Sequence, residues 1–201
     1  MTKYNKYTQF KTVDIKQRDW PNNSLNKCPI WCSVDLRDGN QALAEPMDSA
    51  RKMKFFKKLI DVGYKEIEVG FPSASDTDFN FIRELINDGH IPDDVTIQVL
   101  TQSREELIIK TIDSLKGSKN AIIHLYNSTS TLQRKVVFKE DMNGVKKIAT
   151  DGAKIISDNI GILNNTNVRL EYSPESFTGT ELPYALEVCE EVLDIWQANE
   201  L

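Results

Sequence analysis

The residues best suited to chemistry stand close together in the segment W-C-S-V-D-L-R-D-G-N-Q, residues 31–41. An apolar, β-prone run leads into Arg37 and Asp38, and Gly39 then allows the backbone to turn tightly. A carboxylate at a strand end can bind a divalent metal ion. A guanidinium can bind a substrate carboxylate or stabilise an oxygen on which negative charge develops. The alternative is a surface turn that contains an Arg–Asp pair.

Polar side chains also end three later β-prone runs. Glu68 lies in E-I-E-V-G-F-P-S, His124 in H-L-Y-N-S-T-S, and Ser173 with Glu175 in E-Y-S-P-E-S. From its strand Glu68 can hold Arg37 in place, and Glu175 can act as a general acid or base. Ser173 can donate a hydrogen bond to a substrate, and the lack of a Ser-His-Asp order argues against its being a nucleophile. For Glu68 and His124 the alternatives are a solvated acid and a structural histidine.

Five β-prone runs alternate with segments whose apolar residues recur every three or four positions. The runs are residues 30–36, 66–69, 95–100, 121–125 and 168–172. Helices are expected to begin at Asp48, at Asp76, near Asp141 and at two capping-box patterns, residues 103–106 and 178–181. Each helix presents one apolar face, which can cover a sheet.

The strict alternation of strand and helix predicts an α/β fold with a parallel sheet and right-handed crossovers. No G-x-G-x-x-G follows the first run, so a dinucleotide-binding fold has no direct support. Polar clusters at successive strand ends are typical of a (β/α)8 barrel, which takes about 250 residues. We therefore expect residues 30–201 to form about the first five units of such a barrel, after an arm of residues 1–29. The alternative is an open five-stranded sheet sufficient by itself.

The composition excludes several classes of function. The net charge of −5 and the lack of a dense basic run argue against a nucleic-acid partner. No apolar run reaches the roughly 20 residues that span a membrane, and the polar N-terminus lacks a signal core, which predicts a cytoplasmic protein. The three cysteines indicate reduced thiols rather than a disulfide framework.

Four motifs in one order closely resemble 2-isopropylmalate synthases of the longer form, whose first motif reads R-D-G-N-Q. They are W-C-S-V-D-L-R-D-G-N-Q-A-L, E-I-E-V-G-F-P-S-A-S, H-L-Y-N-S-T-S-T-L-Q-R and E-Y-S-P-E-S-F-T-G-T-E-L. The resemblance implies a barrel acyltransferase that condenses acetyl-CoA with 2-oxoisovalerate in leucine biosynthesis. Homocitrate and citramalate synthases are the nearest enzymatic alternatives. A non-catalytic α/β interaction module is the alternative from a different class.

The resemblance also implies a role for each matching residue. Asp38 is expected to bind a divalent metal ion, Mg, Mn or Zn, and Arg37 to stabilise the keto or enolate oxygen beside it. His124 and Ser173 are expected to contact the 2-oxo acid. Glu175 matches an acid that takes part in the acid–base chemistry.

Glu68 and Gln41 are expected to support these residues, and the full-length enzymes are expected to be homodimers. The sequence departs from the family at the metal site, which the family completes with an H-x-H motif on a later strand. No H-x-H occurs in these 201 residues. With one carboxylate ligand we expect weak metal affinity, and little or no synthase activity from this chain alone.

Overall fold

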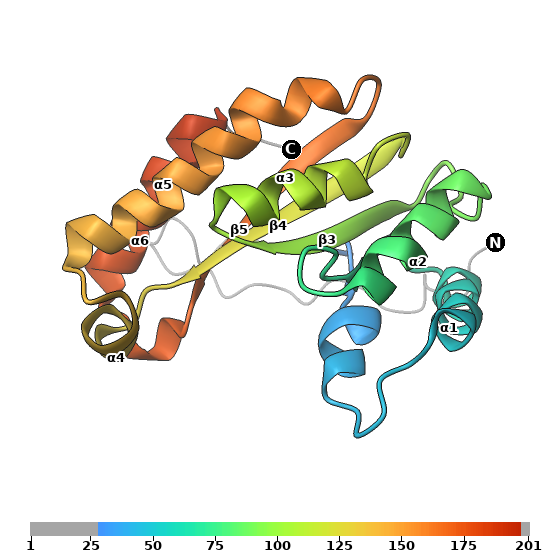
Figure 1. Ribbon diagram of the computed structural model, residues 1–201, viewed down its shortest axis with the longest axis horizontal. Helices are drawn as coiled ribbons and strands as arrows, with labels where there is room; N and C mark the ends of the chain where they lie inside the picture. Colours follow the sequence, from blue (N-terminus) through green and yellow to red (C-terminus); the bar gives the residue numbers. More distant parts are fainter. Residues whose placement is uncertain (1–27, 198–201) are drawn as a thin grey trace, which may run out of the picture. The chain divides into compact units, whose positions relative to one another are not determined.

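The computed structural model describes residues 28–197, and Figure 1 shows their helices and strands in chain order. The chain forms two units, Met1–Ile30 and Trp31–Leu201, and every element named below belongs to the second. The arm predicted for residues 1–29 falls almost entirely outside the described residues. Its boundary therefore stays a prediction.

Over the described residues, five strands form one parallel sheet in the order β1-β2-β3-β4-β5. The strands are β1 (Cys32–Ser33), β2 (Glu66–Gly70), β3 (Thr96–Gln102), β4 (Asn120–Ser128) and β5 (Asn167–Glu175). Each strand pairs with the next one along the chain, and helical segments make the connections. This is the arrangement of five consecutive units of a (β/α)8 barrel, as the alternation in the sequence predicted.

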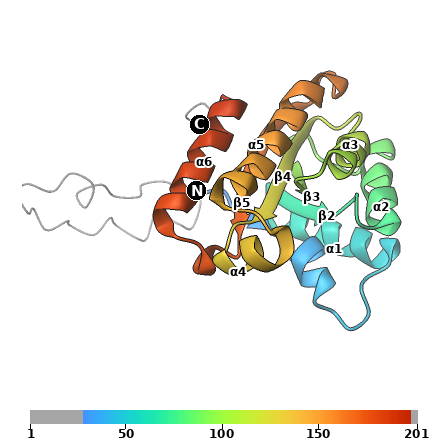
Figure 2. The same cartoon turned by 60° about the vertical axis from the view of Figure 1, so that its left-hand side comes forward.

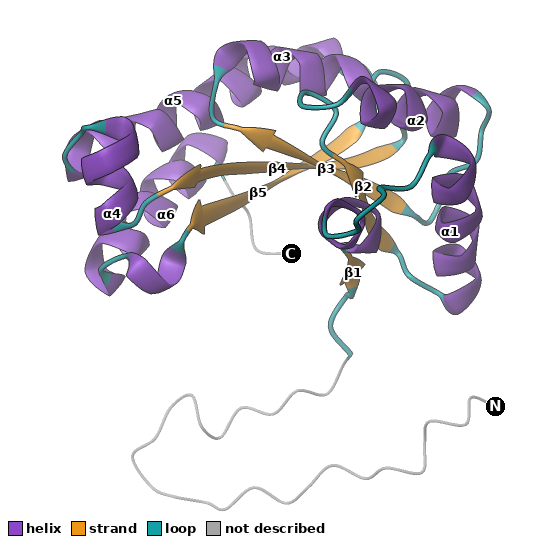
Figure 3. Cartoon of the chain, turned by 60° about the horizontal axis from the view of Figure 1, so that its bottom comes forward, coloured by secondary structure: helices purple, strands orange, loops and turns teal. Residues whose placement is uncertain are grey.

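The helices lie along one side of the curved sheet, as Figure 3 shows. The longer ones are α1 (Ser49–Val62), α2 (Asp76–Asn87), α3 (Glu105–Ser114), α5 (Met142–Asn159) and α6 (Leu182–Trp196). The short ones are α4 (Thr131–Gln133), the π-helical turns η2 (Asp35–Gly39) and η3 (Arg134–Phe138), and the 3-10 turns η4 (Ile160–Ile162) and η5 (Phe177–Gly179). Figure 2 shows α5 and α6 packed side by side. Among residues 28–197 no helix has the length and apolar character needed to cross a membrane.

The apolar core fills the space between the sheet and its helices. Ile67 and Val69 of β2 are fully buried in one cluster with Phe56 of α1 and Phe81 of α2. Successive side chains of a strand point to opposite faces, so Glu68, between Ile67 and Val69, points away from the helices. The same alternation along the other strands places the polar residues of the motifs on the face that the helices leave open.

The predicted helix starts at Asp48 and Asp141 are confirmed. Each side chain accepts a hydrogen bond from the backbone N–H three residues later, at 2.8 Å in both cases. The cap predicted at Asp76 is off by one residue: α2 begins at Asp76, and Ser75 caps it by accepting from the N–H of Asp78 at 3.3 Å.

A helix follows each of the two predicted capping boxes, but neither capping box forms. Ser103 donates its hydroxyl to the carbonyl of Ile148 at 2.5 Å, which leaves Arg104 at the N-cap of α3 without a side-chain cap. Residues 177–179 form a 3-10 turn of their own, so α6 begins later, with Glu181 at its N-cap. In neither case does a side chain cap the helix with the local hydrogen bond that the spacing predicted.

The strand predicted for residues 30–36 is wrong in its second half. The pairing of β1 covers only Cys32–Ser33, and the chain then turns into η2. The carbonyl oxygen of Val34 accepts from three successive backbone N–H groups, at 3.2, 2.9 and 3.2 Å, which closes the turn. Leu36 is fully buried inside this turn rather than in a strand.

The strands β4 and β5 are longer than predicted. They reach Ser128 and Glu175, so Asn127, Ser128, Ser173 and Glu175 lie within strands instead of in the loops after them. The backbone pairing continues to the end, since the N–H of Thr129 donates to the carbonyl of Glu175 at 3.0 Å. The side chains on these strands are therefore held by the sheet itself.

Candidate active site

The turn η2 carries Arg37 to the end of β2, where its guanidinium contacts two carboxylates. Nε donates to Oε2 of Glu68 at 2.6 Å, and Nη1 lies 3.0 Å from Oδ1 of Asp38. The side chain of Asp38 is 58% exposed, whereas that of Glu68 is fully buried. Arg37 therefore has one partner fixed inside the protein and one that is open to solvent.

Glu68 links three side chains from neighbouring elements. One oxygen accepts from Arg37, and the other lies 2.9 Å from Nδ1 of His124 and 3.3 Å from Nε2 of Gln98. Burial by itself would raise the pKa of Glu68. The hydrogen bond with His124 and the positive charge of Arg37 outweigh it, so the pKa lies below the usual glutamate range. Glu68 is thus an anion that fixes both Arg37 and His124.

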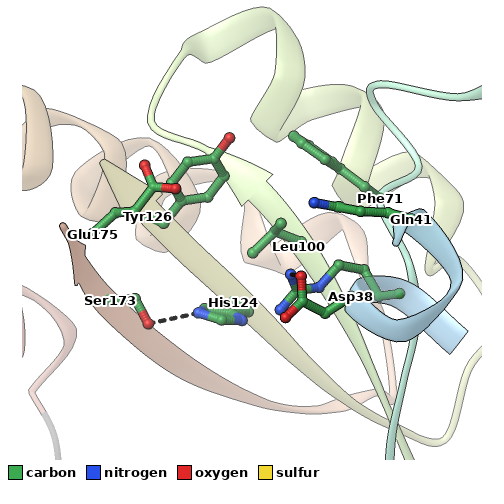
Figure 4. Close-up of a pocket in the computed structure, with 9 residues that line it drawn as sticks. Asp38, Gln41, Phe71, Leu100, His124, Tyr126, Ser173 and Glu175 are labelled. Atoms are coloured by element: carbon green, nitrogen blue, oxygen red, sulfur yellow. Dashed lines mark hydrogen bonds and ion pairs between the residues drawn. The ribbon is translucent and has the colours of Figure 1, made fainter. Parts of the chain in front are cut away.

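His124 and Ser173 meet across the pairing of β4 with β5. Nε2 of His124 lies 2.7 Å from Oγ of Ser173, a contact that Figure 4 marks with a dashed line. Oε1 of Glu171, the neighbour of His124 in the strand register, lies 3.3 Å from the same Nε2. Both ring nitrogens of His124 are therefore in contact with oxygen atoms.

Glu175 lies at the far end of the same strand. Its Oε2 accepts a hydrogen bond from Oγ of Ser128 at 2.5 Å. Burial raises the pKa of Tyr126, and the negative charge of Glu175 raises it further. Figure 4 shows Glu175 and Tyr126 next to each other, on the opposite side of the cavity from Asp38.

These side chains surround one cavity of about 360 Å³. Six of the residues predicted for the site line it: Arg37, Asp38, Gln41, His124, Ser173 and Glu175. The seventh, Glu68, does not line the cavity but bonds two of the residues that do. The structure therefore brings the predicted residues together, while their roles in binding or catalysis stay predictions.

Four further residues belong to this site and were not predicted. Phe71, Leu100 and Tyr126 line the cavity, and Gln98 contacts both Glu68 and His124. The sequence does contain a sign of Gln98. It is a polar residue in the β-prone run T-I-Q-V-L, where it must point to the opposite face from Ile97 and Val99. Leu100 lies on the same strand face as Gln98, and Tyr126 on the same face as His124. Neither was predicted, because apolar and aromatic residues in a strand ordinarily belong to the hydrophobic core.

The described residues do not complete a metal centre. Among residues 28–197 no three His, Cys, Asp or Glu side chains are placed to share one ion. Asp38 offers a single exposed carboxylate beside the cavity, which suits one ligand of a divalent ion. Zinc sites ordinarily use three or more protein ligands.

The thiol of Cys32 approaches the buried network, with Sγ 3.7 Å from Oε1 of Gln98. Burial raises its pKa to about 12, with the negative charges of Glu68, Glu171 and Glu66 adding to the effect. The thiol therefore stays protonated at neutral pH, which makes it a poor nucleophile.

The family model described as HMGL-like matches residues 28–199. The chain belongs to the HMGL-like family. Within it, the chain is similar to the 2-isopropylmalate synthase of Parafrankia sp. (strain EAN1pec), with 62% identity over 192 residues, 95% of this chain and 34% of that protein. It is 56% identical to the 2-isopropylmalate synthase of Clostridium acetobutylicum over 199 residues, 98% of this chain and 36% of that protein.

These matches confirm the resemblance that the four motifs predicted. The chain spans about a third of the length of the curated relatives it matches. A crystal structure of the HMG-CoA lyase of Bacillus subtilis superposes with a TM-score of 0.56 at 15% identity, over 83% of this chain and 55% of that one. At this identity the likeness shows the fold, and it agrees with a partial (β/α)8 barrel.

Proposed function

We propose that this chain carries part of the active site of a 2-isopropylmalate synthase, an acyltransferase that joins acetyl-CoA to 2-oxoisovalerate. A base removes a proton from the acetyl methyl group, the carbanion attacks the keto carbon, and water hydrolyses the thioester to release CoA. The observation that carries the proposal is the convergence of four motifs on one cavity. The 62% identity to a protein of that name supports it.

Arg37 is the residue proposed to stabilise the keto oxygen as negative charge develops on it. Its Nε is held by buried Glu68 and its Nη1 by Asp38, so the guanidinium is oriented before a ligand arrives. Fixed donors stabilise a transition state more than mobile ones, because no reorganisation is needed at the moment of reaction.

His124 and Ser173 are proposed to contact the 2-oxo acid. Leu100 and Phe71 give the same cavity an apolar wall. An apolar wall suits the isopropyl group of 2-oxoisovalerate better than the second carboxylate of a 2-oxo diacid, because a buried charge without a partner is costly. This favours the proposed substrate over that of a homocitrate synthase.

Glu175 is proposed to take part in the acid–base chemistry. Its carboxylate lines the cavity and has one hydrogen bond from Ser128, which leaves its second oxygen for a ligand. Gln41 lines the cavity with Phe71, as Figure 4 shows, and is proposed to support the bound substrates.

A bound divalent metal ion would polarise the keto group of the substrate. Asp38 is the residue proposed to hold it, but the described residues supply no complete ligand set. No step above is therefore assigned to a metal, and these 201 residues by themselves are expected to show little or no synthase activity.

A segment exchange tests the proposal. The matching segment of the Clostridium acetobutylicum enzyme is replaced by this chain, and CoA release is measured with acetyl-CoA and 2-oxoisovalerate, pyruvate or 2-oxoglutarate. We expect activity within about tenfold of the parent, and the highest kcat/KM with 2-oxoisovalerate. A folded exchange protein without CoA release, or one that prefers another 2-oxo acid, would contradict the proposal.

Arg37→Gln in the exchanged enzyme is expected to lower kcat roughly 10²–10³-fold, the usual loss when a donor to a developing oxyanion is removed. Arg51→Gln is the matched control, because Arg51 is exposed on α1, outside the cavity. It should leave kcat unchanged.

A further inference from the structure

We propose that Ser173, His124 and Glu68 form a nucleophilic relay that takes an acyl group from a small ester or thioester and transfers it to water. The sequence order argued against a nucleophilic serine, but the fold brings the three residues together from three strands. This activity goes beyond the proposed condensation. It uses neither a metal ion nor a 2-oxo acid, so its failure and the failure of the proposed function are distinguishable.

The geometry of the three side chains is that of a serine activated by an oriented histidine. Oγ of Ser173 lies 2.7 Å from Nε2 of His124, and Nδ1 of the same ring lies 2.9 Å from Oε1 of Glu68. A nucleophile, a base within hydrogen-bond reach and a third group that orients the base are the recurring parts of such sites. The acid is fully buried, so solvent does not compete for the ring.

The surroundings of the ring select the tautomer that the relay needs. Glu68 and Glu171 can both only accept when ionised, but Glu68 is fully buried and lies 2.9 Å from Nδ1, whereas Glu171 is half-exposed and lies 3.3 Å from Nε2. The proton of a neutral His124 therefore belongs on Nδ1, and Nε2 is free to accept. Nε2 of Gln98 lies 3.3 Å from Nδ1 of His124 and 3.3 Å from Oε1 of Glu68. Because Nδ1 carries the proton, the carboxylate of Glu68 is the acceptor for this amide. His124 Nε2 then accepts the hydroxyl proton of Ser173.

Two more charged groups lie near the relay. Oε1 of Glu171 is 3.3 Å from Nε2, and its negative charge favours the imidazolium that forms when the ring takes a proton. Arg37 lines the same cavity, with Nε on Glu68 and Nη1 on Asp38. With Nε and Nη1 engaged by these described residues, Nη2 is the donor proposed for the oxygen of a reacting carbonyl in the cavity.

The reaction has two balanced steps. Ser173 Oγ attacks the carbonyl carbon of the ester or thioester while its proton moves to His124 Nε2. The C–O or C–S bond then breaks, the leaving group takes that proton, and the acyl group remains as an ester on Ser173. In the second step water gives a proton to Nε2 and attacks the acyl-serine. The carboxylic acid leaves, and Oγ regains the proton.

The first test uses p-nitrophenyl acetate and acetyl-CoA as acyl donors for the full chain at pH 8. We expect peptide mass spectrometry to find the acetyl group on Ser173, together with nitrophenol or CoA release that exceeds the rate without protein. Ser173→Ala should remove both, and Ser157→Ala, on the exposed face of α5, should remove neither. Acetyl groups found only on other residues, or equal rates in the two variants, would overturn the proposal.

A second test leaves the buried network intact and separates a relay from a hydrogen bond that merely holds Ser173. In Ser173→Cys the imidazole should keep the thiol partly ionised. Alkylation by iodoacetamide should then persist at pH 6, below the ordinary cysteine pKa of about 8.5. The matched variant Ser157→Cys should instead lose reactivity about tenfold for each pH unit below that value. Identical pH profiles for the two variants would overturn the proposal.

Discussion

Glu68 and Asp38 are both carboxylates that pair with Arg37, yet the protein treats them in opposite ways. Glu68 is fully buried and contacts Arg37, Gln98 and His124, whereas the side chain of Asp38 is 58% exposed and lies beside the cavity. One acid therefore positions the side chains of the site, and the other faces what binds there. Variants that change one acid at a time test this distinction.

The largest expected effect is on stability when Glu68 is changed. Glu68→Gln should lower the free energy of unfolding by about 3–5 kcal/mol, because it removes the buried counter-charge of Arg37 and leaves only the exposed carboxylate of Asp38 as its ionic partner. Asp38→Asn should cost less than about 0.5 kcal/mol, because exposed pairs contribute little. Urea denaturation of both variants measures the difference. Equal losses would show that burial does not separate the two acids.

A buried and an exposed ion pair can also be compared outside the site, where two lysines pair with acids in the first turn of α2. Lys52 is fully buried in an ion pair with Asp78 and lies 5.5 Å from the ring centre of Phe81, whereas Lys110 pairs with Asp76 in solvent.

Lys52→Met should cost about 2 kcal/mol, less than Glu68→Gln, because Asp78 keeps a hydrogen bond from the N–H of Phe71 at 2.8 Å. Lys110→Met should cost less than about 0.5 kcal/mol. Urea midpoints provide the measurement, and a larger loss for Lys110→Met would contradict the prediction.

The smallest expected effect is in the pH dependence of stability. The pKa of Glu68 is lower in the folded state than its unfolded value of about 4.3, so the folded state gains stability from its ionisation. This contribution is complete above about pH 4.3 and is lost as the pH falls through the folded pKa. Glu68→Gln should therefore show a flatter loss of stability on acidification than the parent. Parallel plots of unfolding free energy against pH for the parent and Glu68→Gln would contradict this prediction.

The sequence predicted the parts of this molecule that depend on local pattern. The alternation of β-prone and helical segments predicted the order of the sheet, and polar residues at strand ends predicted Arg37, His124 and Ser173 as neighbours in one cavity. The first strand was predicted too long because its apolar run continues through Leu36, which is buried in a turn instead.

The rest could not be predicted, because it depends on contacts between distant elements. The hydroxyl of Ser103 has the spacing of a helix cap but bonds Ile148, which lies on another helix. Glu68 was expected to support Arg37, but nothing in the sequence shows that it also holds His124, a residue two strands away. That contact turns a set of polar residues into a connected site.

The protonation of His124 tests this connection most directly. The chain has two histidines, so a proton–nitrogen correlation spectrum of the imidazoles at pH 8 is simple to assign, with His90 as an internal reference. The structure predicts that His124 carries its proton on Nδ1, and that Glu68→Gln releases the ring to a mixture of tautomers while Asp38→Asn does not. A proton on Nε2 of the parent chain would contradict the central claim that Glu68 organises this site.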